Sequence, residues 1–287
     1  MNYNNYPKVL LAILSGSIIA GCGPAKYNLV DSNDKEGTTV RSEGKWDFMD
    51  ADLTIVSPQG TITGKADSNA HSITNTRVLE VVGGKASVTE VTHEEDALKT
   101  KVTTNGQTRE TDQKLPLQGT TVIRKLTDGM WKQRIKGAEP TEEQKRHLTD
   151  VSATSTSLFP DHAVAVGEVW TVLPENFKGI LGPNLLTCEG TMTCTFVRVE
   201  EFEGHKYAVV LSALDGHGTF LDDKNYEETI TMNVKGTFYR SMSALAGSRS
   251  ELRGTMKTEI VVPQNGQKLT MVVTGPVTVT DTNTITQ

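Results

Sequence analysis

Apolar and polar residues alternate with a period close to two from Trp46 onward. In the segment 251–260 the even positions, which include Leu252, Met256 and Ile260, are mostly apolar, whereas odd positions such as Lys257 are polar. The segments 229–238 and 268–279 alternate in the same way. Strands with one apolar face are typical of antiparallel sheets that pack on one side and meet water on the other.

Turn dipeptides separate these alternating segments. They are Gly83-Gly84, Asn105-Gly106, Asp128-Gly129, Glu203-Gly204 and Asn265-Gly266. Such pairs tolerate positive φ and are favoured in tight hairpins. We therefore predict a mainly β protein, with a meander of long antiparallel strands. The apolar residues before and after Asn265-Gly266 should lie side by side on one packed face.

A single short helix is predicted near 141–149. Thr141 is followed three residues later by Gln144, with two Glu between them, which matches a capping box with acidic residues in the first helical turn. The helix would divide the β-rich domain, 45–287, into two halves, 45–138 and 160–287. An internal duplication and a curved half-barrel are both compatible with this pattern.

The first 22 residues have a different character. Lys8 precedes an apolar run, Val9–Ala20, that is too short to span a bilayer, for which about 20 residues are needed. It matches the apolar core of an export signal, and Ile19-Ala20-Gly21-Cys22 ends it. This end resembles the lipobox of bacterial lipoproteins, the site of signal peptidase II. The resemblance implies a signal peptide over 1–21, cleavage between Gly21 and Cys22, and lipidation of Cys22.

A lipidated Cys22 would anchor the chain to a membrane without spanning it. Each buried methylene contributes about 0.8 kcal/mol, and two or more acyl chains such as palmitate anchor a protein stably. Gly23, where Asp commonly retains lipoproteins in the inner membrane, favours the outer membrane, facing the periplasm. Residues 22–44 are rich in Gly, Asn, Asp, Ser and Lys, and we expect them to form a flexible tether.

Charge and composition exclude some partners. The chain has 29 Lys and Arg against 35 Asp and Glu, for a net charge of −6. Lys8 is the only charged residue of the leader, so its removal makes the mature protein more acidic. Nucleic-acid binding requires clustered basic residues, and we therefore expect no nucleic-acid partner.

Two cysteines follow the lipobox. On one extended strand Cys188 and Cys194 would be about 20 Å apart, too far for a disulfide. A turn at Glu189-Gly190-Thr191 would allow them to pair. The alternation Met192, Cys194, Phe196 favours a continuous strand with free thiols that face a core.

Few residues are candidates for chemistry. Asp215-Gly216-His217-Gly218, with Asp222, is the best candidate for a metal or catalytic site, although a solvated hairpin loop accounts for it more simply. His93, within Thr92–Asp96, begins a pattern like a zinc-protease motif, but the second His is absent and a solvated acidic turn is expected. The sequence has no catalytic or cofactor-binding motif, so we expect no cofactor and no enzymatic activity.

The segment 158–170, LFPDHAVAVGEVW, is similar to an "fP…V.vGd.W" element of uncharacterised exported β-rich bacterial proteins. A turn at Pro160 and Gly167, with Trp170 buried at a strand start, would account for it. Trp46, Trp131 and Trp170 are expected in core packing, with a ligand-stacking platform as the alternative.

Together these features predict a membrane-anchored envelope lipoprotein without enzymatic activity. It would bind an amphipathic ligand or a protein partner in the envelope. A purely structural or assembly protein is one alternative. A metal-dependent envelope hydrolase that uses the Asp215 and His217 loop is another.

Overall fold

The structure, a computed structural model, describes residues 25–29, 34–148, 151–152, 158–182, 185–221, 226–242, 247–264 and 267–286. The predicted leader 1–21, Cys22, Asp222 and the turn Asn265-Gly266 lie outside the described residues. The predictions about them stay predictions.

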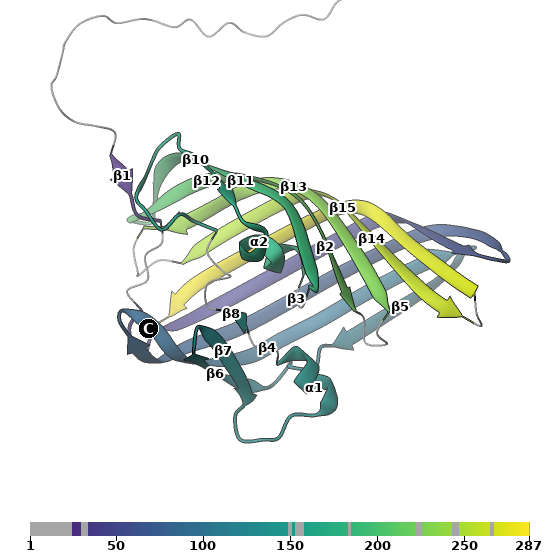
Figure 1. The fold of residues 1–287 in the computed structure, drawn as a ribbon, viewed down its shortest axis with the longest axis horizontal. Coiled ribbons are helices and arrows are strands. Elements are labelled where there is room, and N and C mark those ends of the chain that lie inside the picture. Colours follow the sequence, from purple (N-terminus) through teal and green to yellow (C-terminus); the bar gives the residue numbers. More distant parts are fainter. Residues whose placement is uncertain are drawn as a thin grey trace, which may run out of the picture.

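The protein is mainly β, as its alternation predicts, and thirteen of its described strands form one antiparallel sheet (Figure 1). Its earlier strands are β2 (Thr39–Ser57), β3 (Gly60–Val82), β4 (Lys85–Thr104), β5 (Gln107–Lys114), β6 (Thr121–Thr127), β7 (Met130–Ile135) and β8 (Val151–Ser152). Its later strands are β10 (Val169–Val172), β11 (Thr187–Phe202), β12 (His205–Leu221), β13 (Glu227–Ser241), β14 (Ser248–Gln264) and β15 (Gln267–Thr286).

The last long strand joins the two halves of the sheet. The order of strands is β10-β11-β12-β13-β14-β15-β2-β3-β4-β6-β7-β8, and β5 pairs with part of β4. In the central pair, Val279 of β15 lies opposite Trp46 of β2. The halves predicted over 45–138 and 160–287 therefore share one sheet, which stays open because its two end strands do not pair with each other.

The ordered strands begin earlier than the sequence predicts. The predicted tether, 22–44, contains β1 (Lys26–Tyr27) and the first residues of β2. β1 pairs with β9 (Val164–Ala165), and Leu29 is buried in the core. Residues 39–44 pair with both β3 and β15. Their polar side chains resemble those of a linker, but their backbone groups are bonded to strands on both sides.

The predicted hairpin turns are confirmed wherever the structure describes them. Both central residues have positive φ at Gly83-Gly84, Asn105-Gly106, Asp128-Gly129 and Glu203-Gly204. Tight turns with this conformation match the twist of the strands that they join. Each turn links neighbouring strands of the sheet or its branch: β3 to β4, β4 to β5, β6 to β7 and β11 to β12.

The predicted helix is confirmed, and the structure also contains a second helix that the sequence does not predict. Helix α1 (Glu142–His147) has the expected capping box, in which Gln144 N donates to Thr141 Oγ1 at 3.2 Å and Thr141 N donates to Gln144 Oε1 at 3.0 Å. It ends at His147, two residues before the predicted end. Helix α2 (Pro174–Leu181) begins with a proline at its first turn, a position where the missing N–H costs nothing.

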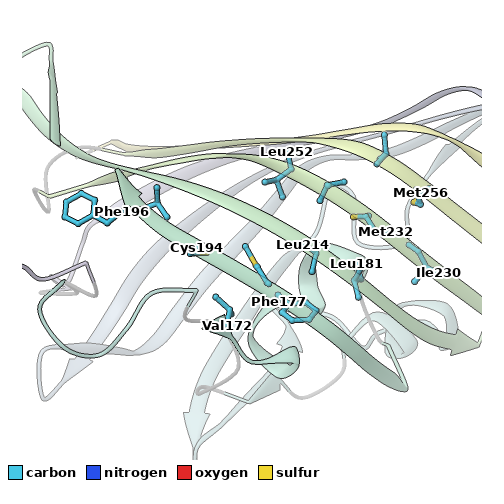
Figure 2. Packing of buried hydrophobic residues seen from close by; sticks show 14 of the residues in the cluster. Val172, Phe177, Leu181, Cys194, Phe196, Leu214, Ile230, Met232, Leu252 and Met256 are labelled. Atoms are coloured by element: carbon cyan, nitrogen blue, oxygen red, sulfur yellow. The ribbon is translucent and has the colours of Figure 1, made fainter. Parts of the chain in front are cut away.

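One face of the sheet, here called the inner face, packs against α2 and carries most of the hydrophobic core (Figure 2). Phe177 and Leu181 of α2 are buried against β11–β13. Leu252 and Met256 are buried on this face, as predicted, and Ile260 pairs with Met271 of the neighbouring strand. The prediction that apolar residues before and after Asn265-Gly266 lie side by side is therefore confirmed.

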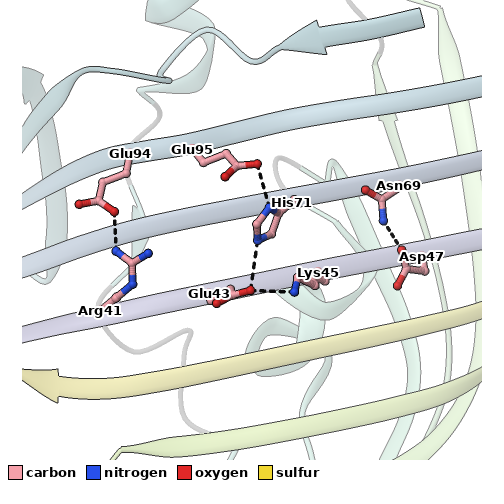
Figure 3. A network of polar contacts seen from close by, with 8 residues as sticks. All are labelled: Arg41, Glu43, Lys45, Asp47, Asn69, His71, Glu94 and Glu95. Atoms are coloured by element: carbon pink, nitrogen blue, oxygen red, sulfur yellow. Dashed lines mark hydrogen bonds and ion pairs between the residues drawn. The ribbon is translucent and has the colours of Figure 1, made fainter. Parts of the chain in front are cut away.

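The opposite face, the outer face, is polar on the earlier strands (Figure 3). His71 Nδ1 lies 2.8 Å from Glu95 Oε1, and its Nε2 lies 3.3 Å from Glu43 Oε1. Glu43 also pairs with Lys45, and Arg41 pairs with Glu94 on β4. These contacts connect β2, β3 and β4 through side chains that are exposed or, for His71, half-buried.

Candidate functional site

Two cavities adjoin on the inner face, beside the last turn of α2. Their volumes are about 330 Å³ and about 340 Å³. Gly179 and Ile180 of α2, together with Val279 and Asp281 of β15, line both. Each volume lies in the range of about 300–1,000 Å³ that is typical of small-molecule sites.

The floor of the first cavity follows from the strand register. Val279, Trp46 and Ala70 are partners across β15, β2 and β3. Two positions along, the partners are Asp281, Gly44, Ser72 and Asp96, across β15, β2, β3 and β4. Side chains of a strand alternate between its faces, so both rows point to the inner face. Ala70, Gly44 and Ser72 are small, which leaves space below α2.

Two carboxyl groups border this floor. Asp281 is half-buried, and burial raises the pKa of its carboxyl, opposed by a hydrogen bond from Asn283. Asn283 Nδ2 donates to Asp281 Oδ2 at 3.0 Å, and Ser42 Oγ donates to Asn283 Oδ1 at 2.5 Å. Burial also raises the pKa of Asp96, against the opposing charge of His147. Asp281 thus has a neutral amide as its hydrogen-bond partner.

The wall of the first cavity is apolar and aromatic. It includes Trp46, Ile180 and Leu181. Trp46 Nε1 is buried and donates to no described group. By contrast, Trp170 Nε1 donates to Leu158 O at 2.9 Å, so Trp170 is held in the packing as predicted. Of these two tryptophans, Trp46 is the one that lines a cavity.

The second cavity is lined in part by Leu158 and Phe159, from the segment that resembles the exported β-rich proteins. Phe159 packs with Phe238 at 6.4 Å and with Trp170 at 6.5 Å between ring centroids. Arg240 lies over the Phe159 ring at 5.8 Å, and its Nε donates to Leu29 O at 3.2 Å. The guanidinium group is therefore already engaged by the protein.

A third cavity, of about 440 Å³, lies on the outer face near the β11–β12 hairpin. Its walls are more polar and include Glu200, Glu203 and Arg249. Arg249 stacks on Tyr239 at 4.2 Å from the ring centroid. Its lining residues belong to β11–β15 and the residues next to these strands, and none belongs to α2, unlike those of the two cavities beside α2.

The sequence predicts a hairpin loop around Asp215 and His217, and this prediction is wrong. Both residues are exposed on the outer face, in the middle of β12. The glycines between and after them face inward: a Cβ on Gly216 would meet Phe177 at 3.3 Å and Leu181 at 3.4 Å. Gly216 thus makes room for α2, and Gly218 makes room for Leu185 and Thr187, so the two glycines serve the packing of the inner face. His217 Nε2 lies 3.3 Å from Glu189 Oε2, and no group of three metal-ligating side chains occurs among the described residues.

The sequence predicts a solvated acidic turn around His93, and this prediction is also wrong. His93 lies inside β4 and is 8% exposed. Burial, followed by the nearby charge of Arg124, lowers the pKa of His93 to about 4. The flanking Glu94 and Glu95 are ion-paired on the outer face with Arg41 and His71. A strand irregularity between Ile73 and Thr74 accommodates the run of polar residues.

The cysteines that the structure describes are free, in agreement with the continuous strand predicted for them. Burial raises the pKa of the Cys194 thiol to about 12, which makes it unreactive near neutral pH. Cys188 is half-buried and its Sγ donates to Pro174 O at 3.4 Å.

Sequence reasoning missed the residues around the two cavities. Ile180 lies on a helix that was not predicted, although Pro174-Glu175 is a helix-start signal. Asp281 continues the inward stripe of Val277 and Val279, so the alternation places a carboxylate on an apolar face. A polar residue at an inward position was the signal for this site.

The remaining observations concern membranes and relatives. Neither helix of the described chain is long and apolar enough to cross a bilayer. No model of a known protein family matches the sequence, and no curated protein matches it either.

Proposed function

We propose that this protein is a lipid-anchored envelope lipoprotein, on the periplasmic side of the outer membrane, that binds an amphipathic ligand on the inner face of its sheet. One observation carries the binding proposal: two cavities adjoin between α2 and β15, and share Ile180, Val279 and Asp281. Ligand sites are commonly concave and mostly apolar, with a few polar groups that orient the ligand.

The polarity of the site is divided in the way that an amphipathic ligand requires. Ile180, Val279 and Trp46 offer an apolar wall. Asp281 and its partner Asn283 offer polar atoms at one side. A hydrocarbon segment would lie against α2, and a polar end would reach the carboxyl groups.

The site can be blocked at Gly179. This residue lines both cavities, and a Cβ added to it would meet no atom within 4 Å. Gly179→Leu therefore places a large side chain beside both cavities with no clash at its Cβ, and it also replaces glycine by a better helix former. Calorimetric titration with decanol, a neutral amphiphile, should show binding to the wild type and at least about tenfold weaker binding to the variant.

Lys178→Leu is the matched control, because it adds the same side chain at an exposed position of the same helix. Its affinity for decanol should equal that of the wild type. Equal affinity for all three proteins would move the site away from α2. No binding to the wild type would overturn the ligand proposal and favour the structural or assembly role.

The lipid anchor rests on the lipobox resemblance around Cys22. Cys22→Ala removes the thiol that would be acylated, so metabolic labelling with a radioactive fatty acid should label the wild type and leave the variant unlabelled. Label on the variant would overturn the anchor and leave the binding proposal standing.

The alternative functions can be compared with the same geometry. A hydrolase centred on Asp215 and His217 would have its groups exposed on a strand, with Glu189 as the ion-pair partner of the imidazole. A protein partner would need an exposed surface, whereas the cavities beside α2 are partly enclosed. The amphipathic ligand therefore has the best support.

A further inference from the structure

The charges around the first cavity determine which polar end the ligand can carry. Asp281 and Asp96 both face the floor, from β15 and β4. Resting on the proposed function, we infer that the ligand is a cationic amphiphile whose ammonium group binds beside Trp46, between these two carboxyl groups.

The basic residues that border the cavity do not balance these acids. Lys45 and His71 contribute to its lining, but their side chains are bound to Glu43 and Glu95 on the outer face (Figure 3). The charge of His147 opposes the effect of burial on the pKa of Asp96. Arg240 lies in the other cavity, where it contacts the Phe159 ring and donates to Leu29 O. Asp281 is bonded to Asn283, which is neutral. A cation in the cavity would therefore supply the missing opposite charge.

The shape of the floor suits a compact head group. Asp281 and Asp96 are three strand spacings apart, or about 14 Å between their backbones. Gly44 and Ser72 lie between them in the same row. These small residues leave room for a head group that can approach either carboxylate.

Trp46 provides a second interaction that favours a cation. Its ring lines the cavity two positions along β2 from Gly44, on the same face. Ammonium groups bind aromatic faces through the ring quadrupole, most strongly to tryptophan. Carboxylates together with an aromatic wall favour a cation, whereas a fatty acid or another anionic head would be repelled by Asp281 and Asp96.

Three decyl compounds test the head group while the tail is held constant: decylammonium, decanol and decanoate. Each is titrated calorimetrically, below its micelle concentration, into the mature chain from residue 23 onward, so that neither the apolar leader nor a lipid anchor competes for the amphiphile. Decylammonium should bind at least about tenfold more tightly than decanol, and decanoate more weakly than decanol.

Asp281→Asn removes the charge and retains the shape. It should weaken decylammonium binding by about tenfold and leave decanol binding unchanged. Asp215→Asn is the control, because it removes an exposed carboxylate on the outer face. Asp96→Asn provides a second variant in case Asp281→Asn does not fold, which circular dichroism would reveal.

The outcomes separate the two proposals. No binding of any decyl compound would overturn the proposed function. Equal affinities for the three head groups, tighter binding of decanoate, or decylammonium binding that is unaffected by both Asn variants would overturn the cationic ligand and leave an amphipathic ligand standing.

Discussion

The inner face of the sheet differs between the later strands, β10–β15, and the earlier strands, β2–β5. On the later strands the inward residues are large and buried, among them Met192, Phe196, Ile230, Met232 and Met256. On β3 and β4 the corresponding positions carry small or polar residues such as Ser68, Ala70 and Thr100. The helix α2 contacts β11–β13, and β5 is exposed along its whole length.

The two regions are therefore stabilised by different interactions. The later strands gain free energy from burial of apolar area, at about 25 cal/mol per Å². The earlier strands bury fewer large apolar side chains, among them Phe48, Leu53 and Val91. They rely more on backbone pairing and on surface ion pairs, each of which contributes only about 0–1 kcal/mol. We expect the later strands to form the stable part of the sheet and the earlier strands to depend on the seam between β15 and β2.

A charge introduced on the inner face gives the largest expected effect. Met256→Asp places an unpaired carboxylate at a position that is 3% exposed, and should lower the free energy of unfolding by about 4–5 kcal/mol. Thr100→Asp, on the same face of β4, should cost less than about 1 kcal/mol. Urea unfolding of both variants measures the difference. Equal midpoints would break the comparison between the two regions.

Lys257→Asp is the control on the same strand. Lys257 is exposed on the outer face and pairs with Glu259 at 2.9 Å, so this change should cost less than about 1 kcal/mol. A loss as large as that of Met256→Asp would show that the outer face of β14 is packed.

The second largest effect is expected when the contact between α2 and the later strands is removed. Phe177→Ala deletes a ring that is fully buried between α2 and the later strands, and should destabilise the protein by about 3–4 kcal/mol. Thermal unfolding checks it, with Lys178→Ala as the exposed neighbour that should change little. A small effect of Phe177→Ala would mean that α2 does not stabilise the later strands.

Among the buried residues of the earlier strands, His93 is titratable, and its buried ring makes that region sensitive to acid. Its pKa is about 4 in the folded protein, against 6.5 when unfolded. As pH falls from 6.5 toward about 4, the unfolded state binds a proton on His93 that the folded state does not bind. The free energy of unfolding therefore decreases. Between about pH 7 and pH 5 this amounts to about 2 kcal/mol.

His93→Gln should remove that part of the pH dependence, because glutamine does not titrate. Urea unfolding of the wild type and the variant at both pH values isolates the contribution. Identical pH profiles for the two proteins would show that the ring of His93 reaches water.

The smallest effect is expected on the outer face of the earlier strands. Arg41 and Glu94 form an exposed ion pair between β2 and β4. A double-mutant cycle with Arg41→Ala and Glu94→Ala should give a coupling of about 0.5 kcal/mol that decreases with added salt. A coupling of several kcal/mol would mean that ion pairs, and not backbone pairing, hold these strands.

The parts of this fold that depend on local sequence could be predicted. Alternation, turn dipeptides and the capping box at Thr141 identify the strands, the hairpins and α1. The site depends on contacts between residues that are distant in the chain. Gly216 flanks a histidine and resembles a loop residue, but it is small because Phe177 packs on it.

The cavity shows the same limit. Trp46, Asp281 and Ile180 are brought together by the pairing of β15 with β2 and by the position of α2. Alternation indicates that Asp281 points inward, but only the strand order shows which residues it faces. The inward direction of each side chain is a local property, whereas its neighbours are set by the topology.

The central position of β15 also sets a constraint on how the chain folds. The strands become available in sequence order, so one edge of β2 stays unpaired until β15, the last described strand, is available. Such an edge can pair with other chains. Contacts between residues this far apart in sequence also slow folding, because long loops must close first. β15 completes the sheet and is the last of the described strands along the chain, so the binding face can form only after β15 is available.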